Sequence, residues 1–514
     1  MEALITMDTT RHYWHKINWI TAFGIPFVLI LWLLRFDSIL LSGTPLLGMT
    51  TGFEYDAVLS IWQLNHGDPL FRNPFDAPFN RAPFNWLFFY SYGNFVHFAM
   101  EVWGLNEAWF STITRFFTMI GSLVGLASLT IGLRLILPQD QSSGKWLSFS
   151  LACLLFLGPL HGFWSFTTRP DVWASAMECL ALVMFMKYIE KKPVKAVFLA
   201  ALFCYLAWSF KQVSITILMT IGLYLLWNRQ WRLALMLSLL SISMWATTFM
   251  IGGQSYMHTV FFSEDQSILL FPFRHGIDVL ILYTAKYFPI VGIFGLLLAL
   301  AAINRGFYGR KISSNMPFPM LLITGSVLST VLCFIASMQS ASSDNYFFPS
   351  ALFLTMTSAA LFQAYATTPQ FHTLIIGGYR VFWGIFILLL LLVLFGLRGK
   401  TNIQEEHRFL TKTMACLQPY DAPRYLQIQK WLSLPWLSGE GFIPWWAYYE
   451  SRHLNPDKFE HNGIGGLIEQ GYFKTLLLSP EVRNQYDLGS LHKYQRTNIT
   501  CGGDSVWVKK PDSP

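Results

Sequence analysis

The stretch from Thr51 to Gly93 contains the residues of this chain with the clearest capacity for chemistry. Acids and bases lie there among aromatic residues, namely Glu54, Asp56, Asp68, Arg72, Asp76 and Arg81. The stretch follows the first apolar run of membrane length, and a hydrocarbon core does not tolerate such charges. Prolines and glycines divide it into short helices and turns. We therefore expect a large extracytoplasmic loop, over about residues 37–108, that forms a water-accessible site above a membrane bundle.

One short helix is expected inside this loop. Asp56 opens the run DAVLSIWQL, in which Val58, Leu59 and Trp62 recur at helical spacing. The pattern predicts a helix that ends at the following HGDP turn and lies flat on the membrane surface. The positive end of the helix dipole would stabilise the Asp56 carboxylate. Glu54, two positions earlier, is a second candidate acid.

Other charged residues fall at the predicted outer ends of helices, namely Arg169, Asp171, Lys211, Arg274, Lys286 and Asp344. The simplest interpretation of any one of them is a charge that faces water or lipid headgroups. Their convergence on one face of the membrane favours lipid-phosphate chemistry. Cations would hold the phosphate of a polyprenyl-phosphate sugar donor, while a carboxylate takes the proton of the acceptor hydroxyl.

Three residues fit these tasks, with Arg81 and Lys211 as the cations and Asp56 as the base. The expected substrate groove comprises Trp62, Trp86, Asp344 and Tyr346. Isolated aromatic residues also occur as an interfacial belt, which is the alternative for the two tryptophans. The sequence contains no phosphate-binding glycine loop, His-Glu-x-x-His motif or nucleophile elbow, so the common soluble-enzyme sites are excluded.

Apolar helices must position these residues. The 514 residues are 53% hydrophobic and only 13% charged, which excludes a soluble protein of this size. We expect an α-helical polytopic membrane protein with about 11 transmembrane helices. The predicted spans are approximately residues 17–34, 109–137, 146–163, 172–188, 196–208, 213–227, 233–250, 289–303, 317–338, 346–365 and 374–397.

Basic segments give the expected orientation. KYIEKKPVK, NRQWR and NRGFYGRK all fall on the cytoplasmic side if the N-terminus is cytoplasmic. Because these clusters act as topology signals, the net charge of +7 does not indicate a nucleic-acid partner. The basic N-terminus lacks a small-residue cleavage site, so we expect a retained first helix in the cytoplasmic (inner) membrane. An odd number of spans places the tail outside.

The tail differs in composition from the rest of the chain. We expect a transmembrane domain over residues 1–397 and a small soluble periplasmic α/β domain over 398–514, with a helix at NIQEEHRFLTKTMACLQ and a strand at FKTLLLS. Cys416 and Cys501 lie in this tail and could pair on the oxidising side of the membrane. The other four cysteines fall in apolar runs, as buried thiols do.

At these residues the chain resembles the polytopic C-type (GT-C) glycosyltransferases, which use lipid-linked sugar donors. The resemblance rests on motifs in a fixed order: FEYDAV after the first span, a GDPLFRNP turn, PFNRAPF, TTRPDVWA and SFKQ. It covers roughly the first half of the chain in detail and the remainder by topology. It implies a GT-C-like fold and an inverting transferase.

The resemblance also implies roles for individual residues. The catalytic acid of the first loop matches Asp56, with Glu54 as its rival, and the second acid corresponds best to Asp171. Relatives that move aminoarabinose or mannose bind the donor phosphate through a basic residue in a K-P-P-like turn, whose place is taken here by Arg81 in NRAPF. Arg169 either binds phosphate or only neutralises Asp171 in a structural ion pair. Without an Asp-x-Asp cluster we expect no cofactor, although some relatives use a divalent metal.

These observations predict a membrane glycosyltransferase that moves a sugar from a polyprenyl-phosphate donor to a glycan, lipid or protein acceptor on the extracytoplasmic face. Membrane lipid surrounds the protein, and no nucleic acid takes part. A catalytically inactive structural or accessory subunit is the alternative. A lipid or sugar transporter fits less well, because its polar residues would lie at mid-membrane in broken inverted-repeat helices.

Overall fold

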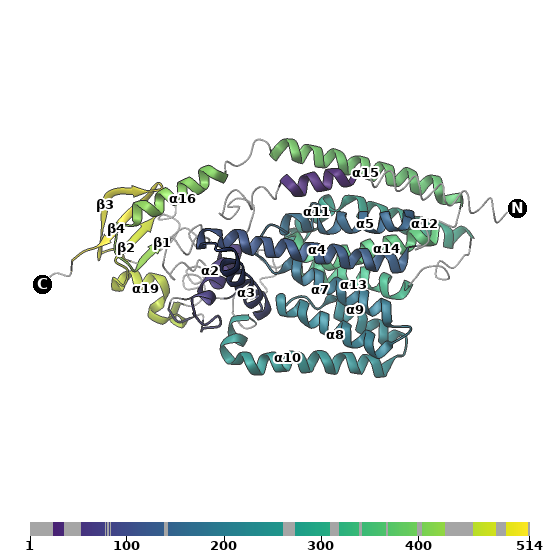
Figure 1. Ribbon diagram of the computed structural model, residues 1–514, viewed down its shortest axis with the longest axis horizontal. Coiled ribbons are helices and arrows are strands. Elements are labelled where there is room, and N and C mark those ends of the chain that lie inside the picture. Colours follow the sequence, from purple (N-terminus) through teal and green to yellow (C-terminus); the bar gives the residue numbers. More distant parts are fainter. Residues whose placement is uncertain are drawn as a thin grey trace.

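A long bundle of helices carries a small mixed α/β unit at one end (Figure 1). The computed structural model describes residues 24–34, 53–73, 75–77, 79, 82, 84–137, 142–260, 273–308, 318–338, 342–365, 369–397, 403–426, 456–479 and 490–511.

The bundle consists of largely apolar helices of different lengths. Its members are Gly24–Leu34, α4 (Phe110–Ile136), α5 (Ser142–Phe156), α7 (Asp171–Tyr188), α8 (Pro193–Phe210), α9 (Thr216–Trp227), α10 (Trp231–Val260), α12 (Phe288–Tyr308), α13 (Pro319–Ser337), α14 (Phe348–Tyr365) and α15 (Pro369–Leu397). Shorter elements join them, namely η1 (Glu107–Trp109), α6 (His161–Trp164), α11 (Phe273–Lys286) and η4 (Asp344–Phe347).

The helix α7 lies at the centre of the bundle. It packs between α4 and α8, while α13 packs on α14 and α9, and α12 packs on α15. Small residues allow the helices to approach closely, as at Gly125, where an added Cβ would lie 2.1 Å from the ring of Phe156. The resulting core is continuous along the bundle.

Six of the described helices are long and apolar enough to cross a membrane, and a seventh span is possible if α11 and α12, bent by 94° at their junction, count as one. Each of the eleven predicted segments overlaps a helix, but the count of eleven spans is not confirmed. The remaining helices are either short, such as α9 with 12 residues, or charged, such as α7 with Asp171, Glu178 and Lys187. The chain is therefore a helical membrane protein with at least six candidate spans in its described part.

The described part of the first loop contains two helices, of which the apolar spacing predicts the first. The first, α2, covers Phe53–Asn65, so it ends at the predicted turn but begins three residues before Asp56. The second, α3 (Trp86–Trp103), begins at Asn85, whose side-chain oxygen accepts a hydrogen bond from the Trp86 backbone N–H at 2.8 Å. The buried face of α2 packs against α3 and against the ends of α7 and α8.

The C-terminal unit combines helices with a small sheet. Its elements are α16 (Ile403–Leu417), β1 (Arg424–Leu426), η6 (Pro456–Lys458), η7 (Glu460–Asn462), α19 (Gly463–Gln470), β2 (Thr475–Leu478), β3 (Tyr494–Cys501) and β4 (Asp504–Lys509). The sheet order is β1-β2-β4-β3, with β1 and β2 parallel and the other pairs antiparallel. The predicted helix and strand of the tail are confirmed as α16 and β2.

This unit does not stand apart from the first loop. Leu59 of α2 is buried among Met414, Leu417 and Val506 of the C-terminal unit. A second cluster joins Phe79 of the loop to the ring of Phe459 and to residues around α19. Polar contacts support them, since the Glu460 carboxylate accepts a hydrogen bond from the Ala77 backbone N–H at 2.9 Å. The helix α2 is therefore packed between the bundle and the C-terminal unit.

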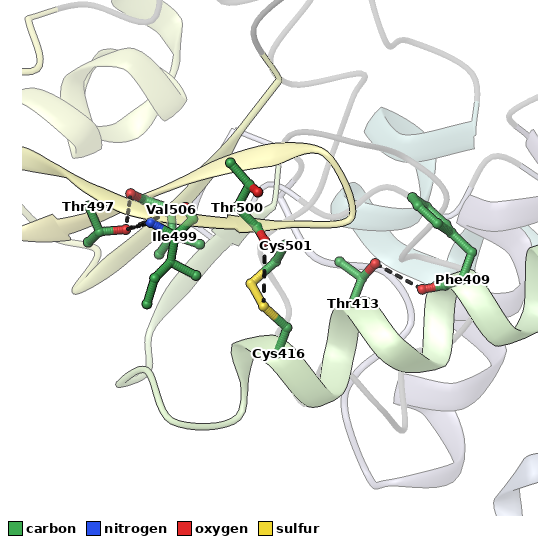
Figure 2. The surroundings of a disulfide bond; sticks show 8 residues. All are labelled: Phe409, Thr413, Cys416, Thr497, Ile499, Thr500, Cys501 and Val506. Carbon is green, nitrogen blue, oxygen red and sulfur yellow. Dashed lines mark hydrogen bonds between the residues drawn. A yellow bond between two sulfur atoms is a disulfide. The ribbon is translucent and has the colours of Figure 1, made fainter.

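A disulfide bond joins Cys416 to Cys501, as the two tail cysteines predict, with a Cα–Cα distance of 5.7 Å (Figure 2). It fixes the C-terminal end of α16 to the β3–β4 hairpin. The four described free cysteines are all buried, as expected.

We expect Cys416→Ser to destabilise the C-terminal unit by up to about 4 kcal/mol, because the bond closes a long loop and so restricts the unfolded chain. Thermal unfolding of the full-length protein in detergent, with limited proteolysis of the tail, measures this loss. A reductant should produce the same change in the wild type and no further change in Cys416→Ser. Equal stability of the variant and the oxidised wild type would contradict the prediction.

Candidate active site

The segment between α6 and α7 lies buried at the end of the bundle that faces α2. It contains the sequence TTRPD, and its backbone is held by side chains from neighbouring helices. The Thr118 hydroxyl donates to the Thr167 carbonyl at 2.8 Å, and the Tyr92 hydroxyl donates to the Arg169 carbonyl at 3.1 Å. A buried loop requires such partners for its polar backbone groups. We call residues 164–171 the central loop.

The carboxylate at the end of this loop is surrounded by donors. Asp171 starts α7, is 2% exposed, and pairs with the Arg169 guanidinium, whose Nε lies 3.1 Å from Oδ2. Its Oδ1 accepts hydrogen bonds from the Lys211 ammonium and from Asn345 Nδ2, the latter at 2.6 Å. Lys211 directly follows α8, and Asn345 lies in η4, so three elements meet at one carboxylate. Two cations share one acid, which leaves this cluster with a formal charge of +1.

A second buried carboxylate ties α2 to the bundle. Glu54 is fully buried, and its Oε1 accepts a hydrogen bond from Arg115 Nε of α4 at 3.1 Å. The same oxygen accepts the backbone N–H of Thr168 in the central loop at 2.8 Å. The carboxylate therefore connects α2, α4 and the central loop.

A third buried carboxylate contacts the start of the central loop at Trp164. Asp344 accepts from the Lys286 ammonium at 2.6 Å and from the Trp164 indole N–H at 3.2 Å. The Arg169 guanidinium lies 4.8 Å from the centre of the same Trp164 ring, a cation–π geometry. Because Asp344 and Asn345 are neighbours, this ion pair and the Asp171 cluster form one network.

A cavity of about 420 Å³ opens beside the network. Asp171, Ser175 and Glu178 of α7, with Lys211 and Asn345, supply its polar wall. Apolar side chains of α9 and α13, including Met219 and Leu332, form the opposite wall. Tyr346 also lines the cavity, and its ring lies 4.7 Å from the Lys211 ammonium. One side of the cavity is thus polar and cationic and the other side is apolar. This combination suits an amphipathic phosphate ligand.

The residues predicted from the sequence fall into three groups. Asp171, Arg169, Lys211, Asp344 and Tyr346 come together around the central loop and the cavity. The half-buried Asp56 and the fully buried Glu54 lie in the first turn of α2, on different sides of that helix. Trp62 and Trp86 are partly buried, in α2 and at the start of α3, and Arg81 lies outside the described residues.

Three residues of the site were missed by sequence reasoning. Arg115 and Glu178 are charged residues inside apolar helices, a signal that the composition of those helices already contained. Asn345 carries no charge and is not distinguished by its neighbours, so only the fold brings it to Asp171.

In the described part of the chain, no group of three or more His, Cys, Asp or Glu side chains could hold a metal ion. The buried acids Glu54, Asp171 and Asp344 are each bonded to a lysine or arginine of their own. Such a donor set does not fit a divalent cation, which prefers several free carboxylate or carbonyl oxygens.

No protein-family model and no curated protein matches this chain. Solved structures nevertheless share its fold. ArnT from Cupriavidus metallidurans bound to undecaprenyl phosphate matches with a TM-score of 0.57 at 11% identity, over 96% of this chain and 99% of that chain. The apo state of ArnT matches with a TM-score of 0.57 at 12% identity, over 95% and 98% of the two chains. The apo oligosaccharyltransferase of Archaeoglobus fulgidus matches with a TM-score of 0.51 at 10% identity, over 89% of this chain and 70% of that chain.

These likenesses confirm the GT-C-like fold that the sequence predicts. The chain has a GT-C-like fold along nearly its whole length, including the C-terminal unit. At identities of 10–12%, the likeness defines the fold alone.

We expect Glu54→Gln to lower the free energy of unfolding by about 3–5 kcal/mol, because it leaves the buried Arg115 guanidinium without this counter-charge. The double variant Glu54→Gln/Arg115→Met should recover part of that loss. A double-mutant cycle of unfolding in detergent measures the coupling.

Asp68→Asn is the matched control for that cycle. It removes an ion pair with Arg72 that is partly exposed, so its effect should stay below about 1 kcal/mol. If Glu54→Gln were no more destabilising than Asp68→Asn, the buried pair would not hold α2 in place.

Proposed function

We propose that this protein is an integral membrane glycosyltransferase that moves a sugar from a polyprenyl-phosphate donor to an acceptor on the extracytoplasmic face of the membrane. The observation that carries the proposal is the cationic cluster of Asp171, Arg169 and Lys211, in which Asp171 and Lys211 line a half-apolar cavity. The GT-C-like fold supports it, since ArnT of the same fold was solved bound to undecaprenyl phosphate.

Lys211 and Arg169 bind the donor phosphate in this proposal. Lys211 lines the cavity, and a lysine ammonium and an arginine guanidinium are both strong donors to phosphate oxygens. Asp171 orients the two cations and keeps them together against their mutual repulsion. Arg81 supplies a further guanidinium, as its place in NRAPF suggests. The apolar wall accommodates the lipid that follows the phosphate.

Asp56 acts as the general base. Its place in the first turn of α2 favours the ionised carboxylate through the helix dipole. As the acceptor hydroxyl oxygen bonds to the anomeric carbon, its proton passes to Asp56 and the bond between that carbon and the phosphate oxygen breaks. The electron pair leaves with the phosphate, which the cations stabilise. Attack opposite the leaving phosphate inverts the anomeric configuration.

The other two acids, Glu54 and Asp171, position neighbouring groups and do not transfer protons. One oxygen of Glu54 and both oxygens of Asp171 are bonded to cations that the fold holds in place, which favours a structural role for these two acids. Glu54 fixes the height and rotation of α2 on the bundle, so it determines where Asp56 lies.

The disulfide of the C-terminal unit supports a periplasmic location for that unit. A disulfide between Cys416 and Cys501 is favoured on the oxidising side of a membrane, which supports a periplasmic C-terminal unit of an inner-membrane protein. We retain residues 1–397 as the membrane domain and 398–514 as the periplasmic domain. Since α2 packs on that unit, the site and the tail share one side of the membrane.

Binding tests the phosphate site directly. We expect Lys211→Met to weaken binding of undecaprenyl phosphate at least about tenfold, the scale for losing a hydrogen bond to a charged group. Titration of the full chain in nanodiscs, followed by native mass spectrometry, measures the affinity. Lys187→Met, an exposed lysine at the other end of α7, is the matched control and should bind normally. Unchanged affinity in Lys211→Met would refute the phosphate role.

A sugar-transfer assay tests the proposed role of Asp56 as the general base. We expect Asp56→Asn to slow sugar transfer at least about a hundredfold with normal membrane insertion, because it keeps the shape and removes the proton acceptor. Asp76→Asn changes an exposed acid of the same loop and should transfer at the wild-type rate. The assay follows a radiolabelled sugar from membranes of the native host into lipid, glycan and protein fractions. If Asp56→Asn retained full transfer, the inactive-subunit alternative would replace the enzyme.

A further inference from the structure

The end of the bundle opposite the candidate active site carries many exposed cations. The helix α7 extends about 27 Å from Asp171 to Tyr188, which is close to the thickness of a hydrocarbon core. At this far end, α7 turns into α8, and α8 packs on α10 (Figure 1). The turns that precede α8 and α10 and the adjoining helix ends contain one acid, Glu190, and six exposed cations: Lys187, Lys191, Lys192, Lys195, Arg229 and Arg232.

These cations lack acidic partners. Among the residues that the structure describes, none of the six forms an ion pair. Two of them share one aromatic ring, since the ammonium groups of Lys195 and Lys187 lie 4.5 and 5.5 Å from the centre of the Tyr188 ring. Like charges at such short range repel one another, and a bound anion relieves that repulsion.

A hollow of about 580 Å³ lies between α8 and α10 at this end, and we call it the α8–α10 hollow. Lys192 and Lys195 supply its charged side, and no acid lines it. Val194, Phe198 and Met236 supply its apolar side. The lysines lie at the start of α8 and Phe198 lies in its second turn, so the lining changes from charged to apolar along a candidate membrane span.

The surroundings place this hollow at the level of lipid headgroups. Trp227 and Trp231 of the neighbouring turn are 72% and 63% exposed, and tryptophan is enriched at the membrane–water interface. The start of α8 has no side-chain cap, and its helix dipole adds positive potential. A second hollow nearby is lined by Arg229 and Arg232 but also by Glu190, which makes it less suited to an anion.

We infer that the α8–α10 hollow binds an anionic phospholipid, with Lys192 and Lys195 on the headgroup phosphate and an acyl chain along Val194 and Phe198. Basic pockets between membrane helices suit such headgroups. A zwitterionic phospholipid is disfavoured, because its own ammonium group would meet the two lysines. The apolar side of the hollow favours a lipid over a soluble phosphate. This site is independent of the proposed sugar transfer, since it lies at the other end of the bundle.

Two double variants separate the hollow from the general charge of this end. Lys192→Gln/Lys195→Gln should weaken binding of an anionic phospholipid about tenfold or more, because each basic residue near a membrane surface contributes roughly a factor of five. Lys187→Gln/Lys191→Gln is the matched control. It removes the same charge from the same region, but neither lysine lines the hollow, so binding should weaken less than about threefold.

A third variant tests the apolar side. Phe198→Ser should weaken phospholipid binding several-fold, because it removes apolar contact with the acyl chain. Phe149→Ser, an exposed phenylalanine of α5 that does not line the hollow, is its control. The replaced side chains are all exposed, so the melting temperatures of these variants in phosphatidylcholine nanodiscs should match that of the wild type.

The experiment places the full chain in nanodiscs of phosphatidylcholine that contain an increasing fraction of phosphatidylglycerol. Native mass spectrometry identifies the lipids that stay bound after release, and thermal unfolding measures the stabilisation that a bound lipid provides. Glycerophosphoglycerol, the same headgroup without acyl chains, is added as a soluble competitor.

Support for the inference is a wild type that retains phosphatidylglycerol in preference to phosphatidylcholine, with that preference lost in Lys192→Gln/Lys195→Gln, weakened in Phe198→Ser and kept in both controls. Equal loss in the two lysine variants would overturn the site, because the cations would then act only through their total charge. Displacement by glycerophosphoglycerol would overturn the choice of a lipid. Undecaprenyl phosphate, which the proposed function places at Lys211, should bind all these variants alike. Weaker binding of it in Lys192→Gln/Lys195→Gln would assign the hollow to the polyprenyl phosphate and overturn the phospholipid site.

Discussion

Three ion pairs, each with a buried carboxylate, hold the end of this bundle together around the central loop. Glu54 with Arg115, Asp171 with Lys211, and Asp344 with Lys286 each join two elements that are distant in sequence. In a low-dielectric interior, removing one member of such a pair leaves the other charge without compensation. The elements that carry these residues are therefore fixed relative to one another, so that in the proposed function the donor phosphate meets a rigid cluster rather than mobile side chains.

This constraint extends outward to α2. One side of that helix is fixed by Glu54 and by apolar contacts with the bundle, and the other by Leu59 in the core of the C-terminal unit. Asp56 is therefore positioned by contacts of α2 with both the bundle and the C-terminal unit. The disulfide at Cys416 acts on the same arrangement, because it secures α16, whose residues pack on α2, to the sheet. A loosened tail should shift Asp56 although no tail residue needs to take part in the reaction.

The positions of most helices and of one strand could be predicted from the sequence for physical reasons. Apolar runs and turn residues gave the helices, the limits of α2 near Asn65 and the strand at Thr475–Leu478, because periodicity and chain breakers act locally. The number of transmembrane spans could not be predicted in the same way. Because α9 is short and α7 carries three charged residues, hydropathy alone does not decide whether these helices cross the membrane. The sequence indicated Arg169 as a partner of Asp171, two residues away, but it did not indicate the more distant partners of the buried acids. Arg115 lies 61 residues from Glu54, and only the packing of α4 against the first loop unites them.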